Sequence, residues 1–203
     1  MRHYILLFCM VMAVFSPASA QQGSTLLFSD WVSAKVESRN PFFASDSLLF
    51  NFDKWNQVLL ATADKKEILK IDRKEFQRVT FSLHGIDYIF EHVPVINGKD
   101  LFQVLVEDSG RYCLYKFIHI DVRVSSYRGH ITNRYYLEDY TYYIVFPFPD
   151  MRVTKLVRWD KKLLKRAFVL SGDSSKVDAF YSAHEELGPG EEFLRGLVEY
   201  LDQ

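Results

Sequence analysis

The sequence predicts an α+β fold, in which an antiparallel β-meander, as a sheet or roll of about eight to ten strands, precedes two or three short helices packed on it. Three observations lead to this prediction. Apolar and polar residues alternate with a period of two from Thr25 to about Trp159, short turns separate the alternating segments, and the period becomes helical after Trp159. One β-rich domain over residues 21–203, with a helical region from about 160 to 203, accounts for all three.

The first twenty residues have the pattern of a cleavable secretory signal. Arg2 gives a positive start, residues 4–15 form an apolar run, and Ala18-Ser19-Ala20 supplies the small residues before a cleavage site at Gln21. The apolar run is shorter than the ~20 residues that a membrane-spanning helix needs. We therefore expect an exported product, periplasmic or extracellular, that is soluble and does not span the membrane once the signal is removed.

The clearest strand is 79–84, where Val79, Phe81 and Leu83 share one face. His84-Gly85 follows and predicts a tight hairpin, because both residues tolerate positive φ. Asn97-Gly98 predicts a second hairpin, between strands 93–96 and 101–106. Further strands are expected at 31–37, 48–53, 58–63, 67–72, 86–90, 112–120, 135–148 and 152–159.

The segment from Ser125 to Asn133 is polar and contains Gly129, so we predict that it forms the longest loop of the sheet. In the C-terminal region, Asp160 and Asp173 are candidate N-caps of the first two helices. A third helix begins near Glu191 and presents an apolar face that includes Phe193, Leu194, Leu197, Val198 and Leu201.

Composition restricts the function classes. Removal of Arg2 with the signal moves the formal net charge from −1 to −2, with both signs scattered, which argues against a nucleic-acid partner. The remaining chain keeps one cysteine, Cys113, so an internal disulfide is not expected. Cys113 lies in an apolar strand, where a buried thiol is inert.

Motifs for catalysis or cofactors are absent from the sequence, and we predict neither enzymatic activity nor a cofactor. There is no phosphate-binding glycine loop and no serine-hydrolase elbow. His184-Glu185-Glu186 resembles the start of a zinc-protease helix but lacks the second histidine, so no metal site is predicted. His119 and Asp121 share a strand face, where a surface pair is the more common interpretation.

The most unusual segment is the aromatic strand 135–148. Rings lie on both of its alternating faces, so at least one row lies opposite the main core. Exposed tyrosines beside acids can stack on sugar rings or bind a protein, although helices covering that face would make them ordinary core. Tyr136, Tyr140 and Tyr142 are the candidate binding surface.

The strand pattern also resembles a group of exported proteins from Gram-negative bacteria of the Bacteroidetes type, to which no activity is assigned. The resemblance rests on these segments: Asp30-Trp31-Val32, 49–54, 102–105, 112–116, Lys176-Val177, Tyr181, Phe193-Leu194 and Tyr200-Leu201. It covers most of the chain after the signal. It implies a periplasmic or envelope setting and carries over no functional residue.

Three hypotheses follow. The leading one is a non-enzymatic envelope module, binding or structural, whose partner is an unidentified protein or surface ligand. The first alternative is a small carrier for an apolar ligand held in a β-sheet cavity. The second is an enzyme of unrecognised type, which would require His119, Asp121, His130 or Glu138 to converge within hydrogen-bond reach of one another.

Overall fold

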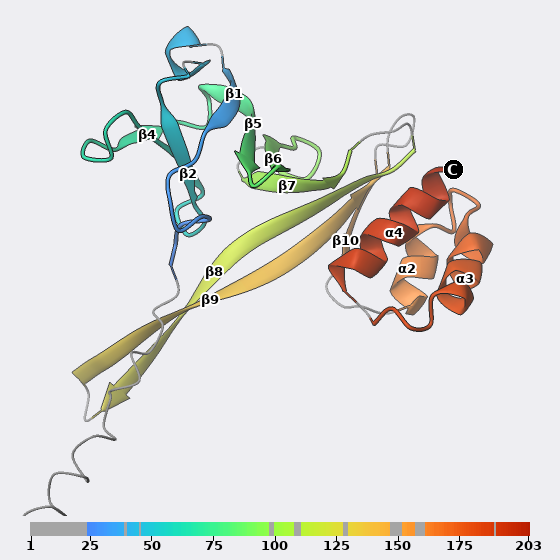
Figure 1. The fold of residues 1–203 in the computed structure, drawn as a ribbon. Helices are drawn as coiled ribbons and strands as arrows, with labels where there is room; N and C mark the ends of the chain where they lie inside the picture. Colours follow the sequence, from blue (N-terminus) through green and yellow to red (C-terminus); the bar gives the residue numbers. More distant parts are fainter. Residues whose placement is uncertain are drawn as a thin grey trace, which may run out of the picture.

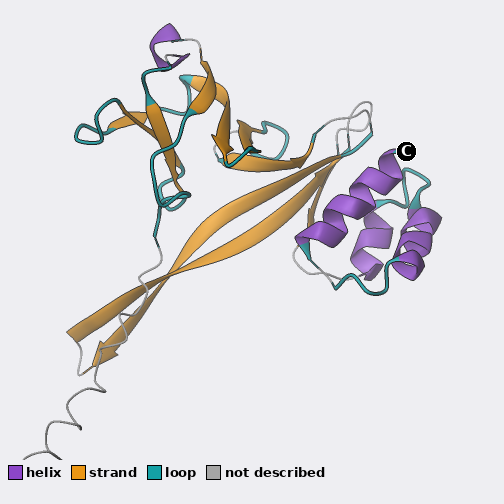
Figure 2. Ribbon diagram, in the orientation of Figure 1, coloured by secondary structure: helices purple, strands orange, loops and turns teal. Residues whose placement is uncertain are grey.

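The computed structural model describes residues 24–38, 40–44, 46–97, 100–107, 111–127, 130–146, 152–156, 161–188 and 190–203. The predicted signal at 1–20 lies outside the described residues, as do Gly98, Gly129 and Asp160. Over the described ranges the fold is α+β, mostly antiparallel strands followed by helices, as the sequence predicts (Figure 2).

The strands form two sheets instead of one. The larger has seven strands in the order β1-β5-β6-β7-β8-β9-β10, which from β5 onward is the predicted meander. A three-stranded sheet, β2-β3-β4, is separate from it. The strand bounds are β1 (Ala34–Ser38), β2 (Leu49–Asp53), β3 (Val58–Thr62), β4 (Leu69–Ile71), β5 (Phe76–Leu83), β6 (Ile86–His92), β7 (Leu101–Val106), β8 (Cys113–Tyr127), β9 (His130–Val145) and β10 (Val153–Leu156).

The turn between β5 and β6 forms as predicted. His84 and Gly85 have φ of 53° and 78°, and they connect Leu83 directly to its cross-strand partner Ile86. The predicted strand at 93–96 is wrong. The Val93 carbonyl accepts hydrogen bonds from the N–H groups of Ile96 (3.0 Å) and Asn97 (3.2 Å), which closes a turn. Pro94 lacks a backbone donor, so this segment is a poor ladder partner.

The predicted loop at 125–133 is also wrong. Strands β8 and β9 continue through it, and their pairing extends to Tyr127 opposite His130. The result is one long hairpin, and its outer half projects away from the rest of the sheet (Figure 1). We call residues 119–127 and 130–138 the arm.

Three helices close the chain: α2 (Lys161–Ala167), α3 (Ser174–Ala183) and α4 (Glu191–Asp202). A short 3-10 helix, η1 (Pro41–Ala44), precedes β2. Asp173 stands at the N-cap of α3, but its carboxylate caps no backbone group. It accepts a 2.5 Å hydrogen bond from the Tyr112 hydroxyl instead, because Tyr112 brings this donor into the same buried space.

One face of the seven-stranded sheet is covered at two places, which leaves a gap between them. The three-stranded sheet covers β1, β5 and β6 through a core that includes Phe50, Phe52, Phe81 and Phe90. The helices cover β7 to β10 through a core that includes Leu114, Ile144, Phe168 and Leu197. Ile118 of β8 belongs to the first core and Leu114 to the second. The strand residues between these two positions therefore lie between the two covering layers.

Candidate binding surface

A network of charged and tyrosine side chains occupies this gap. It comprises Lys54, Lys116, Glu138, Tyr140, Tyr142 and Glu191, and we call it the tyrosine–carboxylate network. The six residues come from the β2–β3 turn, β8, β9 and the first turn of α4. Their strand members share one face, because Lys116 is the cross-strand partner of Tyr142, and Tyr140 and Glu138 follow at intervals of two.

The contacts begin at Lys54, whose side chain is only 4% exposed and whose ammonium forms an ion pair with Glu138. The other Glu138 oxygen accepts a 2.7 Å hydrogen bond from the Tyr140 hydroxyl. Burial would raise the pKa of Glu138, but the hydrogen bonds from Lys54 and Tyr140 and the Lys54 charge outweigh it and lower that pKa. Glu138 is therefore held as a carboxylate.

Lys116 connects the two halves of the network. Its ammonium lies 4.1 Å from the centre of the Tyr140 ring and 2.8 Å from the Glu191 carboxylate. The same carboxylate oxygen accepts a 3.2 Å hydrogen bond from the Tyr142 hydroxyl. Burial, together with the neighbouring carboxylates, raises the pKa of Tyr142, and it raises the pKa of Tyr140 to about 12. Both phenols are therefore neutral hydrogen-bond donors at physiological pH.

The three tyrosines predicted from the sequence have different environments. Tyr142 is 8% exposed and hydrogen-bonded to the first turn of α4, so it is part of the core and not of an open surface. Tyr140 is 41% exposed. Tyr136 is half-buried because the ring of Trp55 lies 5.1 Å from it. The helices thus cover one end of this face of β9 and leave the other end open.

Trp55 is the residue that sequence reasoning missed. It is 42% exposed and lies in the β2–β3 turn, next to Lys54. We call Trp55, Tyr136 and Tyr140 the aromatic patch. The alternation of a strand gives no information about a turn residue far away in the sequence. The one sequence signal for Trp55 is a large aromatic residue within a polar turn.

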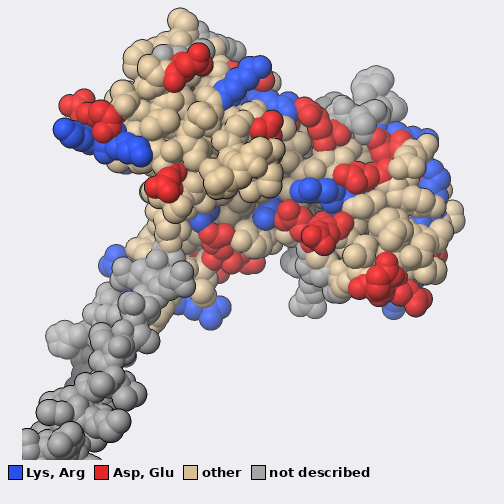
Figure 3. Space-filling model, in the orientation of Figure 1, with Lys and Arg blue, Asp and Glu red and all other residues tan. Residues whose placement is uncertain are grey.

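The charges around the patch are mixed. On the face shown in Figure 3, lysines and arginines alternate with acidic side chains and form no continuous basic area. A ligand on the patch would contact the ring faces and the partly exposed Glu138 carboxylate, whereas the Lys54 and Lys116 side chains are largely buried.

Of the four residues required for an unrecognised catalytic site, His119 and Asp121 share one face of β8, and Glu138 and His130 lie apart from them. His119 lies 3.3 Å from Asp139 across the hairpin, on the face opposite Glu138. His130 pairs with Tyr127 at the end of the arm, roughly 26 Å along the strand from His119. Proton transfer between such positions is excluded by distance. Within the described ranges, no three His, Cys, Asp or Glu side chains gather to hold a metal ion.

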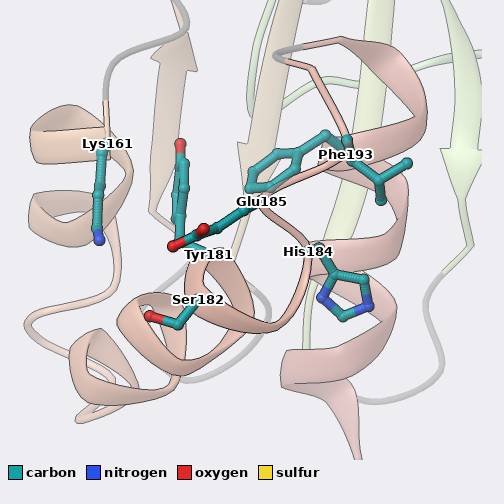
Figure 4. A pocket seen from close by; sticks show the side chains of 7 residues that line it. Lys161, Tyr181, Ser182, His184, Glu185 and Phe193 are labelled. Atoms are coloured by element: carbon teal, nitrogen blue, oxygen red, sulfur yellow. The ribbon is translucent and has the colours of Figure 1, made fainter.

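The helices contain a separate pocket of about 380 Å³ (Figure 4). The His184 ring and the Lys161 ammonium lie at opposite ends of it. His184 follows the last residue of α3, stacks on Phe180 at 4.1 Å and contacts the Phe180 carbonyl through Nδ1. Lys161 lies over the Tyr181 ring and pairs with Asp178. Each of these two side chains thus has its own partners within the helices, so neither points to a ligand in this pocket.

Comparison with protein families, with curated proteins and with solved structures finds no match to this chain. None of the helices in the described part of the chain is both long and apolar enough to span a bilayer. The geometry of the aromatic patch is therefore the only support for assigning it as a candidate binding site.

Proposed function

We propose that this protein is a non-enzymatic module of the cell envelope that binds a surface glycan or a partner protein through the aromatic patch. The observation that carries the proposal is that two exposed rings adjoin one ion pair. Trp55 follows Lys54 in the β2–β3 turn, and the Tyr140 hydroxyl donates to Glu138, the partner of Lys54. Rings offer large contact area at low entropic cost, and the partly exposed Glu138 carboxylate can supply a directional contact.

Export is part of the proposal. Its support is the signal-like segment at residues 1–20 and the resemblance to exported envelope proteins, which together suggest the periplasm or the cell surface.

The carrier alternative is weaker. The space between the two sheets is filled by Phe50, Phe52, Phe81 and Phe90, each at most 1% exposed. Two open spaces lie nearby. One of about 540 Å³ between β1, β5 and the segment before β2 is lined by Lys35, Asp46 and Ser82 beside Val36 and Leu48. A groove of about 410 Å³ between β6, β7 and α4 is lined by polar groups that include Glu191 and Arg195. A polar open groove is a poor site for an apolar ligand.

The test is a double substitution, Trp55→Ala with Tyr140→Ala. We expect it to weaken binding to the recognised ligand at least tenfold, because aromatic anchors dominate binding energy. Binding is measured by fluorescence titration against oligosaccharides and by cross-linking to envelope proteins. Stacking on a ligand should change the emission of Trp55, so a Trp55→Phe chain should lose that change.

The matched control is Tyr135→Ala. Tyr135 has a similar exposure but lies on the opposite face of β9. The proposal fails if Tyr135→Ala weakens binding as strongly as the double substitution, or if the double substitution leaves every detected interaction intact.

A further inference from the structure

The arm has two outer edges, and neither has a partner strand in the described part of the chain. β10 pairs with β9 only at residues 142–145, and β7 pairs with β8 only as far as Lys116. In the described part of the chain, no strand lies against this edge of β8 beyond Lys116. An unpaired edge presents backbone N–H and C=O groups that a further strand can bind.

Two contacts show which backbone groups point outward. Gln57 donates a 2.9 Å hydrogen bond to the Ile118 carbonyl from outside the hairpin. Across the hairpin, the N–H of Tyr140, the partner of Ile118, is taken by the Asp139 carboxylate, so it also faces away from β8. Outward groups recur every second residue along a strand. Those of Ile120, Val122 and Val124 therefore form the free edge.

The side chains of this segment form a pattern that is complementary to itself. Ile120, Val122 and Val124 lie on one face, and Val124 is 50% exposed. Asp121 and Arg123 lie exposed on the other face. None of the ion pairs within the described residues includes either of them. Reading the segment in reverse exchanges the acid for the base and leaves the apolar positions in place.

We propose that a second copy of this chain pairs antiparallel with this edge, around a twofold axis at Val122. Val122 then faces its own equivalent, with both backbone groups of each copy hydrogen-bonded. Asp121 faces the partner subunit's Arg123, and Arg123 faces the partner subunit's Asp121. Ile120 packs against the partner's Val124. Every pair across the new edge is apolar with apolar or acid with base.

The charges also select this register. Moving the axis by one residue to Asp121 places two aspartates directly opposite each other, and moving it to Arg123 places two arginines opposite each other. Like charges in directly opposed positions destabilise a strand pair. The alternation of side chains forbids the intermediate registers, because they would exchange the two faces. Among these registers, only the one centred on Val122 pairs acid with base.

The test exchanges the charges. The chain without residues 1–20 should form a dimer that dissociates on dilution, measured by sedimentation equilibrium. Asp121→Arg or Arg123→Asp alone should raise the dimer dissociation constant at least tenfold, because each places like charges opposite each other twice. An equimolar mixture of the two variants should form the mixed dimer at close to the original affinity. The double variant Asp121→Arg with Arg123→Asp should also dimerise.

A monomer at all concentrations up to about 1 mM would overturn the proposal. So would a mixture that associates no better than its components. Val122→Pro removes one outward N–H and should abolish dimerisation while circular dichroism stays unchanged, since proline is tolerated at a strand edge. Arg134→Asp, on the neighbouring strand β9, should leave the dimer intact. If this variant is monomeric, the contact between the two copies belongs to β9 and not to β8. Trp55→Ala should leave the dimer unchanged, which separates this test from that of the aromatic patch.

Discussion

At the scale of single residues, Glu138 connects the three-stranded sheet to the long hairpin. Its carboxylate is the ion-pair partner of Lys54, and a lysine that is 4% exposed requires a counter-charge. Glu138 itself is about one-third exposed, so water moderates the strength of the pair. The contact nevertheless fixes the turn that carries Trp55 against β9.

We predict that Glu138→Gln lowers the free energy of unfolding by about 1–3 kcal/mol at neutral pH, because Lys54 loses its counter-charge. Urea denaturation measures this change. Adding Lys54→Met should restore part of the loss, since no buried charge is then left unpaired. An unchanged urea midpoint in the single variant would show that the ion pair is not a stabilising contact.

The pH dependence of stability tests the same residue. The pKa of Glu138 is lowered in the folded protein, so its contribution is complete above the ordinary value of 4.5 and is lost as the pH falls through the lower folded pKa. We expect the original chain to lose more stability than Glu138→Gln between pH 6 and about pH 3. Identical pH profiles would contradict the assignment.

Residue parity explains what the sequence predicted of the tyrosine strand. Alternation correctly placed Tyr136, Tyr140 and Tyr142 on one face, because successive strand residues point to opposite sides. It had no means of showing that α4 covers Tyr142 while the β2–β3 turn reaches Tyr136. Those contacts join segments up to 81 residues apart, from Trp55 to Tyr136, and depend on the tertiary packing.

At the scale of elements, the arm shows where a pattern can mislead. Segment 125–133 is polar and contains a glycine, a composition that predicts a loop. The period-two signal requires one buried face, and none of the described side chains at 121–126 and 134–138 is buried. The strands are held instead by continuous cross-strand pairing, from Cys113 opposite Val145 to Tyr127 opposite His130.

Helix α4 represents the opposite case, in which the pattern was sufficient. Its five predicted apolar residues are all buried, because spacings of three and four place them on one face. We predict that Leu197→Ala lowers the free energy of unfolding by about 2–5 kcal/mol through cavity formation. Chemical denaturation is the measurement. Glu199→Ala, on the exposed face of the same helix, should change stability by no more than about 0.5 kcal/mol.

At the scale of the whole molecule, two covering layers share one sheet, and the arm projects beyond both (Figure 1). None of the described side chains of the arm, at 119–126 and 134–138, belongs to the two cores described above or to a third buried cluster around Phe102 on the other face of the sheet. The contacts of the arm with the body include Trp55 with Tyr136 and Lys54 with Glu138. We therefore expect the outer part of the arm, beyond Asp121 and Leu137, to contribute little to the stability of the body.

We predict that replacing residues 122–136 by a two-residue Asn-Gly turn leaves a folded chain. Asp121 and Leu137, whose backbone groups face each other across the hairpin, would then flank the turn, and Glu138 keeps its ion pair with Lys54. Circular dichroism should keep its β-rich form, and thermal unfolding should stay cooperative with a midpoint lowered by only about 2–4 °C. Loss of cooperative unfolding would show that the arm stabilises the body.

The sequence by itself determined the α+β class, the meander from β5 to β10, the His84-Gly85 turn and the buried face of α4. Each of these depends on local periodicity or on the φ of one or two residues. The tertiary structure decided that β2 to β4 form a second sheet, that Tyr142 is covered, and that Trp55 joins Tyr136 and Tyr140. These outcomes depend on which distant faces pack together, and alternation specifies that a face is apolar without specifying its partner.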